Sequence, residues 1–236
     1  MGIPFRRWTD RHNHWLAIGL TFTLVMSLTF SSWKSAREES LAAARGSFDV
    51  AVSKTHEAIR TRVQDYEQVL RSAGALFAAA GTVERAEFRT FVEQLRITNV
   101  YGGITSIAYM PRVRQAELAA HLKSMQAEGY AEYRVRPRGE RDEYFPVVFI
   151  EPFSAENRRV IGYDGMGDPV RRQAMLRARD RGTILLTERV VLEQERSEQP
   201  QPGLVMYMPV YQRGFRAGTE TQRQASIIGF VSVAFR

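Results

Sequence analysis

The chain has 236 residues, with 33 basic and 26 acidic side chains, a net charge of +7 and no cysteine. The lack of cysteine excludes disulfides, a thiolate nucleophile and a cysteine-based metal site. Nearly all the basic residues are arginines scattered among the acids, whereas a nucleic-acid binder gathers its charge on one face, so we expect no nucleic-acid partner. Apolar residues make up 44% of the chain, which is ample for a packed core.

Residues 15–33 form a run without charged side chains, and this run predicts a membrane-spanning helix. At about 1.5 Å per residue the run reaches roughly 28 Å, close to the thickness of a bilayer's hydrocarbon core. Trp15 and Trp33 lie at its two ends, where indole rings favour the lipid–water boundary. The run separates a short stub, residues 1–14, from a body of roughly 200 residues.

The charges around this run predict its orientation. Three arginines and one acid precede it, whereas two basic side chains mixed with two acids follow it. Because Lys and Arg favour the cytoplasmic side, we expect the stub inside and the body outside, in the periplasm or beyond, with the anchor in a bacterial inner membrane. The alternative is a cleaved signal peptide, but the run exceeds the usual 7–15 apolar residues.

Residues 34–80 are predicted to form a long stalk helix that ends at Gly81. Apolar side chains recur along it at alternating spacings of four and three residues for nearly four heptads. This seam consists of Val52, His56, Ile59, Val63, Tyr66, Leu70, Ala73 and Phe77. Such a seam can pair with a second copy of the chain, giving a homodimer, or pack against the chain's own globular part, and the pattern is the same in both cases.

Residues 81–236 predict an α+β body with an antiparallel sheet and inserted helices. The expected helices are 83–96, 113–127 and 168–182, the last opened by Asp168 and Pro169 and closed by Gly182. The expected strands are 103–110, 144–151, 183–187, 189–193, 204–211 and 226–235, with an alternating segment at 131–137 and hairpin-type loops at 194–203 and 212–225. The last strand runs into Arg236 without a closing turn, and we expect a second membrane span and a cytoplasmic effector beyond it.

The sequence predicts no catalytic residue, no metal site and no cofactor. A G-x-S-x-G elbow, a phosphate-binding loop and a dinucleotide fingerprint are all missing from it. His56 lies in THEAIRTRV, which resembles the phosphoacceptor box of histidine kinases, but Arg62 stands where that box needs a proline. His56 is therefore interpreted as a seam residue, and the chain as non-catalytic.

Polar residues beside apolar strands between 143 and 211 predict a pocket for a small ligand. The candidate ligand-binding residues are Tyr144, Pro146, Asp164, Arg171, Arg172, Thr187, Tyr207 and Met208. Two other functions stay open, a membrane-tethered protein-interaction module and a periplasmic enzyme. A large exposed apolar patch would favour the first, and an ordered nucleophile–base pair in a cleft the second.

Several runs in order, YGGITSIAYMPRV, EYFPVVFIEP (143–152), GYD (162–164), PVRRQAMLRARDRG, ILLT and LVMYMPVY, resemble the CHASE domain. This family forms the extracytoplasmic sensory part of bacterial histidine kinases, of diguanylate cyclases or phosphodiesterases, and of plant cytokinin receptors. The resemblance covers about residues 85–211, and the run to Arg236 resembles the closing strand. It implies a stalk helix followed by two PAS-like subdomains, of which the membrane-distal one binds ligand.

Cytokinin receptors carry a segment that aligns without gaps to Asp164 through Thr187, and their adenine-contacting acid then falls at Arg171. A guanidinium cannot accept the hydrogen bonds that a carboxylate accepts, so the resemblance implies a ligand other than a cytokinin. We expect Arg171 or Arg172 to pair with an anionic or carbonyl-bearing ligand. The alternative is that both arginines lie on the helix's outer face or bond Asp168 locally. The sequence as a whole predicts the sensory portion of a membrane-anchored receptor.

Overall fold

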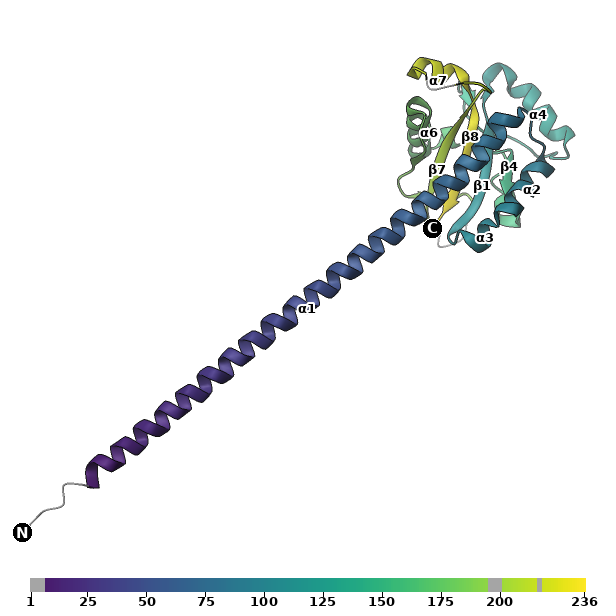
Figure 1. Cartoon of the computed structure of the whole chain (residues 1–236). Coiled ribbons are helices and arrows are strands. Elements are labelled where there is room, and N and C mark those ends of the chain that lie inside the picture. The colour runs from purple at the N-terminus through teal and green to yellow at the C-terminus, as the bar shows by residue number, and fades with distance from the viewer. Residues whose placement is uncertain (1–6, 195–200, 216–217) are drawn as a thin grey trace, which may run out of the picture. The chain divides into compact units, whose positions relative to one another are not determined.

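A computed structural model describes residues 7–194, 201–215 and 218–236. The chain divides into two units, Met1–Arg60 and Thr61–Arg236. One helix, α1 (Arg7–Ala80), provides the first unit and the opening residues of the second (Figure 1). The other helices are α2 (Arg85–Leu95), α3 (Ile97–Val100), α4 (Leu118–Ala127), α5 (Ala155–Arg158), α6 (Pro169–Arg181) and α7 (Glu220–Ser226), with 3₁₀ turns at Gln115–Glu117 and Gly165–Gly167.

The second unit is built on an antiparallel six-stranded sheet in the order β4-β1-β8-β7-β5, with β6 paired to β7. Its strands are β1 (Ile104–Pro111), β4 (Phe149–Glu151), β5 (Leu185–Leu186), β6 (Val190–Val191), β7 (Pro202–Tyr211) and β8 (Ile227–Phe235). The two long ladders flank β8, in which Val233 lies opposite Ile107 of β1 and Met206 of β7. A separate pair joins β2 (Val113–Arg114) to β3 (Glu143–Tyr144).

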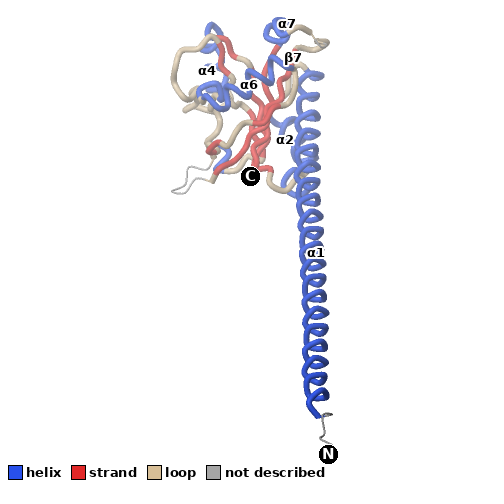
Figure 2. The backbone as a smooth tube through the Cα atoms, turned by 90° about the vertical axis from the view of Figure 1, so that its left-hand side faces the viewer, coloured by secondary structure: helices blue, strands red, loops and turns tan. Residues whose placement is uncertain are grey.

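Helices cover both faces of this sheet. Figure 2 shows the strands between the end of α1 with α2 on one side and α4 with α6 on the other. Because side chains alternate along a strand, β7 serves both layers: Met206 and Val210 join the cluster with α1 and α2, while Val205 and Tyr207 join the cluster with α6. The predicted α+β class with an antiparallel sheet is confirmed. The two PAS-like subdomains stay a prediction.

The heptad seam of the stalk divides into two parts. Tyr66, Leu70 and Phe77 are buried in the second unit, where the Phe77 ring stacks on Tyr109 with centroids 3.6 Å apart. The earlier seam residue Ile59 is 59% exposed. Packing against the chain's own globular part is therefore confirmed for the seam from Val63 onward, whereas the earlier seam residues Val52 and Ile59 are at least half exposed.

Helix α6 follows its local signals. The Asp168 carboxylate accepts the backbone N–H of Arg171 at 2.9 Å, Pro169 takes the first helical position, and Gly182 ends the helix with a φ of +68°. An N-cap carboxylate and a left-handed glycine satisfy the backbone groups that a helix leaves open at its ends.

Elsewhere the sequence prediction was wrong in detail. The expected helix 113–127 begins only at Leu118, because Val113–Arg114 pair with β3. The expected strand 144–151 is split around Pro146, which has no N–H for a ladder. Segment 131–137 forms only an isolated bridge from Arg136, and the strands expected at 183–187 and 189–193 shrink to the short β5 and β6.

The two predicted loops also differ. The loop expected at 212–225 contains α7, opened by a capping box in which the Thr219 side chain bonds the backbone of Gln222 and the Gln222 side chain bonds the backbone of Thr219. The loop expected at 194–203 falls largely on residues outside the described ranges, and β7 already begins at Pro202.

Candidate functional site

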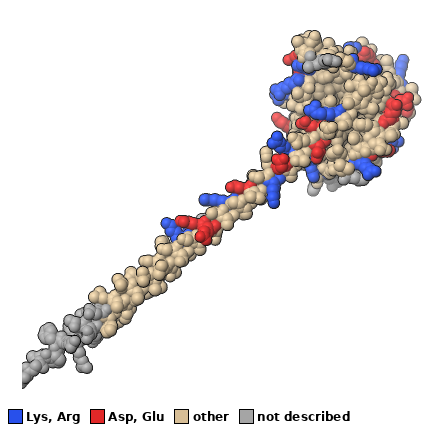
Figure 3. Space-filling model, in the orientation of Figure 1, with Lys and Arg blue, Asp and Glu red and all other residues tan. Residues whose placement is uncertain are grey.

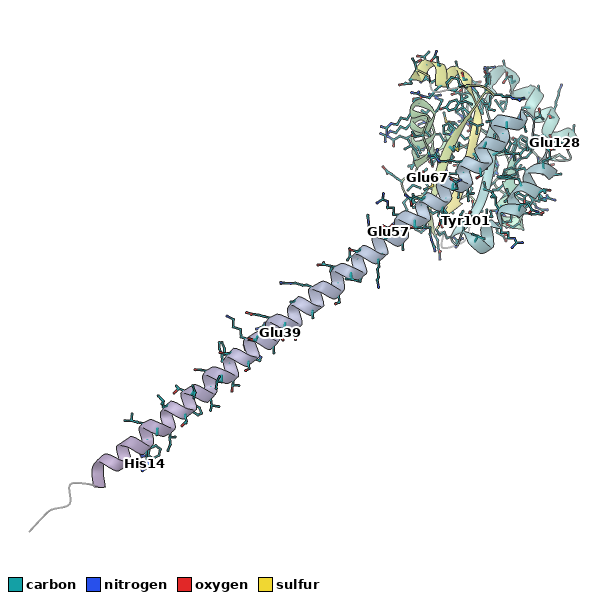
Figure 4. The ribbon with its side chains drawn as sticks, viewed as in Figure 1. His14, Glu39, Glu57, Glu67, Tyr101 and Glu128 are labelled. Carbon is teal, nitrogen blue, oxygen red and sulfur yellow. The ribbon has the colours of Figure 1, made fainter. Side chains whose placement is uncertain are left out.

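The first candidate feature is the uncharged part of α1. Its apolar side chains are exposed, Leu20 to 75%. Figure 3 shows a stretch of helix surface without Lys, Arg, Asp or Glu, and Figure 4 places His14 before it and Glu39 beyond it. By length and composition, this is the one helix among the described residues that could cross a membrane. A surface so apolar is stabilised by lipid rather than by water.

The second feature is an apolar stripe on α1 between the uncharged stretch and the second unit. Phe48, Val52 and Ile59 follow one another at spacings of four and seven residues, which places them on one side of the helix. Each is at least half exposed. Charged side chains such as Glu57 project from this part of the helix (Figure 4). Large apolar side chains left in water on one stripe are typical of a helix that pairs with another.

The third feature is a buried carboxylate, Asp164, in the loop before α6. Its Oδ1 accepts the backbone N–H groups of Phe145 (3.1 Å) and Met166 (3.0 Å), and its Oδ2 lies 3.2 Å from Nε and 3.1 Å from Nη2 of Arg141. No part of Asp164 reaches the surface. The carboxylate thus fastens three separate loop segments, at 141, 145 and 166, to one point.

Arg171 lies beneath the first turn of α6, with only 6% of its side chain exposed. The guanidinium donates to the carbonyl oxygen of Val191 at 2.7 Å and to the Tyr163 hydroxyl at 3.1 Å, and lies 5.2 Å from the centre of the Tyr163 ring. Its Nη1 is 3.6 Å from Oδ2 of Asp168. Arg171 is thus buried with a local ion pair to Asp168, whereas Arg172 is exposed beside it. Pairing of either arginine with a ligand stays a prediction.

Burial governs the electrostatics of this cluster. It raises the pKa of Asp164 even though two backbone N–H groups and Arg141 stabilise the carboxylate. It also raises the pKa of Tyr163 to about 12, against the opposing effect of Arg171, and raises the pKa of Tyr207. Each shift favours the uncharged form, as expected where water is excluded.

Thr187 bonds within the sheet, whereas Tyr207 lies beside the cluster. The Thr187 hydroxyl accepts the backbone N–H of Val205 at 3.0 Å, and the Thr187 N–H donates to the Val205 carbonyl at 2.9 Å. The Tyr207 hydroxyl lies 3.3 Å from where a Cβ at Gly165 would stand, so its ring fills the space below the loop.

The remaining candidates, Tyr144, Pro146 and Met208, lie in three different places. The Tyr144 hydroxyl lies 2.6 Å from Oε1 of Gln115 and holds the turn before β3, while Pro146 is buried and bridges to Asp164. Met208 faces the opposite layer: a Cβ at Gly74 of α1 would lie 2.8 Å from its Cε. The structure therefore gathers Pro146, Asp164, Arg171 and Tyr207 on the α6 side, and Met208 lies across the sheet from them.

Two members of the cluster were missed by the sequence reasoning. Arg141 lies in the charged turn 138–143, which has the composition of a solvated surface, and no local signal marks it as the partner of Asp164. Tyr163 directly precedes Asp164, and this adjacency in sequence is the one signal that could have pointed to it. Within the described ranges, no group of three His, Cys, Asp or Glu residues is placed to hold a metal ion.

The sequence model of the CHASE domain matches residues 81–236. The chain belongs to the CHASE domain family. The matched residues contain α2 through α7 and every strand of the sheet. A search of curated proteins found no match. The resemblance inferred from the sequence is thus confirmed.

CHASE domains are extracellular sensory domains of signalling receptors. In this chain the CHASE domain follows a helix that is long and apolar enough to cross a membrane, an arrangement consistent with a membrane protein. The cluster around Asp164 belongs to the CHASE domain and organises the loops that precede α6.

Proposed function

We propose that this chain is the ligand-sensing, membrane-anchored portion of a bacterial signal-transduction receptor. Residues 15–33 anchor it in the inner membrane, and the CHASE domain faces the periplasm or the cell exterior. The observation that carries the proposal is the uncharged helix preceding a CHASE domain, with basic residues concentrated on the N-terminal side.

Topology reporters test this proposal. Alkaline phosphatase, which is active only outside the cytoplasm, and a fluorescent protein that matures only in the cytosol are fused in turn to Arg236. We expect phosphatase activity and no fluorescence. Fluorescence without phosphatase activity would place the CHASE domain in the cytoplasm and refute the sensory role outside the cell.

The receptor acts as a homodimer through the exposed stripe of α1. Supporting this, Phe48, Val52 and Ile59 share one side of the helix and lie in water, whereas the seam from Tyr66 onward is occupied by the chain's own sheet. Burying three such side chains per chain contributes about 1.5–3 kcal/mol each before the cost of ordering, which is sufficient to bias helix pairing.

The absence of native cysteine makes this stripe easy to test. Single-cysteine variants Val52→Cys and Ile59→Cys are oxidised in membranes, with Lys54→Cys and Glu57→Cys as controls on other sides of the same helix. Disulfide dimers at the stripe positions and few at the controls support the pairing. Equal cross-linking at all four positions would show random collision instead.

The ligand is a small molecule other than a cytokinin. In support, Arg171 occupies the position of the carboxylate expected for adenine and donates hydrogen bonds rather than accepting them. Ligand binding shifts the pairing of two α1 helices, and the output is a histidine kinase or a diguanylate cyclase or phosphodiesterase. Such a relay requires a ligand with different affinities for two arrangements of the dimer.

A further inference from the structure

An arginine-rich hollow of about 640 Å³ lies beside α6, on the side that faces the β2–β3 pair. Five arginines line it, and we name it the arginine basin after them: Arg112, Arg114, Arg141, Arg172 and Arg179. They come from three parts of the chain, namely the end of β1 with β2, the turn before β3, and α6. The fold thus brings together guanidinium groups that are far apart in the sequence.

Glu143 also lines the basin and is bound by two of its arginines. Its carboxylate is held between two guanidinium groups, with Oε2 2.7 Å from Nε of Arg112 and Oε1 2.9 Å from Nη1 of Arg179. All three side chains are at most 20% exposed. Charge-assisted hydrogen bonds of this length from two cations make a built-in carboxylate site.

The basin keeps donors beyond those that Glu143 uses. Arg112 also donates from Nη1 to the carbonyl oxygen of Gln224 at 3.2 Å, and Arg179 donates from Nε to Asp180 at 2.8 Å. Because each guanidinium carries five N–H donors, both still have Nη2 donors for a further oxyanion. Arg172 lies seven residues before Arg179, hence on the same side of α6, and its side chain has no hydrogen-bond or ion-pair partner within the described part of the chain. The other four arginines each have a carboxylate partner, namely Glu143 for Arg112 and Arg179, Glu117 for Arg114, and Asp164 for Arg141. Arg172 is therefore the guanidinium of the basin that is placed to meet an anion from solvent.

We propose that the arginine basin binds a small oxyanion with two or more negative charges, a di- or tricarboxylate or a phosphate, and that Glu143 competes with it from within the protein. Several guanidinium groups around one hollow favour a multivalent anion over a monovalent one, because each charged group adds its own paired hydrogen bonds. This inference rests on the proposed function for its meaning, since it assigns the chemical class of the sensed ligand. The basin meets the interior cluster around Asp164 at one residue, Arg141, which lines the basin and pairs with Asp164.

Isothermal titration calorimetry of the 236-residue chain in detergent micelles tests the proposal, in low-chloride buffer. The probes are citrate, succinate and inorganic phosphate, with acetate as the monovalent control. We expect citrate or phosphate to bind with a Kd below about 1 mM and acetate to bind at least tenfold more weakly. Binding of citrate or phosphate, with acetate weaker, supports the proposal. The probe with the lower Kd shows whether the oxyanion is a carboxylate or a phosphate.

Matched variants separate the basin from general charge effects. Arg172→Gln should weaken binding about tenfold, while Arg177→Gln, an exposed arginine on the same helix that does not line the basin, should leave it unchanged. Glu143→Gln should strengthen binding several-fold, because the internal competitor is lost. If Glu143→Gln fails to fold, Asp142→Asn, an exposed acid that also lines the basin, should strengthen binding to a smaller extent.

Three results would overturn the inference: no heat with any probe in both the unmodified chain and the Glu143→Gln variant, equal losses in Arg172→Gln and Arg177→Gln, or unchanged affinity in Glu143→Gln. These measurements depend neither on membrane orientation nor on signalling. If the topology experiment fails, the binding measurements still test the basin. If the basin binds no anion, the proposal of a membrane-anchored sensor is still tested by the topology experiment.

Discussion

Replacing Phe77 by alanine should sharply destabilise the second unit. The ring is 3% exposed, stacks on Tyr109 at 3.6 Å with an angle of 7°, and lies 5.6 Å from the Phe88 ring. The lost transfer free energy of the ring accounts for about 2–3 kcal/mol, and the cavity left between α1 and the sheet raises the cost to about 3–5 kcal/mol. For a unit of this size each kcal/mol corresponds to roughly 2–4 °C in Tm, so we expect a fall of about 10 °C.

Thermal melts of the full chain in detergent, followed by circular dichroism, measure this change. Val50→Ala is the matched control, because Val50 is an apolar residue of the same helix that is 54% exposed and off the stripe of Phe48 and Val52. It should move the Tm by less than about 1 °C. A fall of under about 2 °C for Phe77→Ala, or similar falls for both variants, would contradict the claim that the end of α1 is a core element of the sheet domain.

Three further predictions concern single contacts. Asp164→Ala should lower the free energy of unfolding by about 3–5 kcal/mol, measured by urea titration, since two backbone N–H groups and Arg141 lose their acceptor; an unchanged midpoint would refute this. Burial lowers the pKa of His121, so as the pH falls the unfolded chain binds the proton before the folded chain does. The free energy of unfolding should therefore decrease as the pH falls below about 6.5. An NMR titration midpoint of His121 above about 6.5 in the folded chain would mean that protonation stabilises the fold instead. Gly229→Ala should cost about 1–3 kcal/mol, because a Cβ there would lie 2.5 Å from a backbone oxygen of β1, while Gly46→Ala, with nothing within 4 Å, should leave the Tm of the sheet domain unchanged.

The sequence predicted best those elements whose signals are local. Helix α6 has its cap at Asp168 and its stop at Gly182 within the same short stretch, so both ends could be found without tertiary information. Helix α7 also has a local start signal, a capping box, but it has no buried residue, so there was no apolar periodicity to set it apart from a polar loop.

The candidate site was harder to predict because its contacts are non-local. Asp164 meets Arg141 across 23 residues, and this pairing depends on how the turn at 138–143 folds back. Met208 is different, because adjacent residues of a strand point to opposite faces and Tyr207 and Met208 could not both line one pocket. The two-residue period of a strand is enough to exclude Met208 from a site that contains Tyr207.

The place of β8 has a consequence for how the protein is made. This strand is the centre of the sheet, with β1 on one side and β7 on the other, yet it is synthesised after both. Until it emerges from the ribosome, β1 lacks its longest ladder and β7 is left with only the short β5 and β6, so both keep unpaired edges that attract other chains. Folding of the sheet domain is accordingly slow and non-local, and we expect a nascent chain halted before Ile227 to depend on chaperones for its solubility.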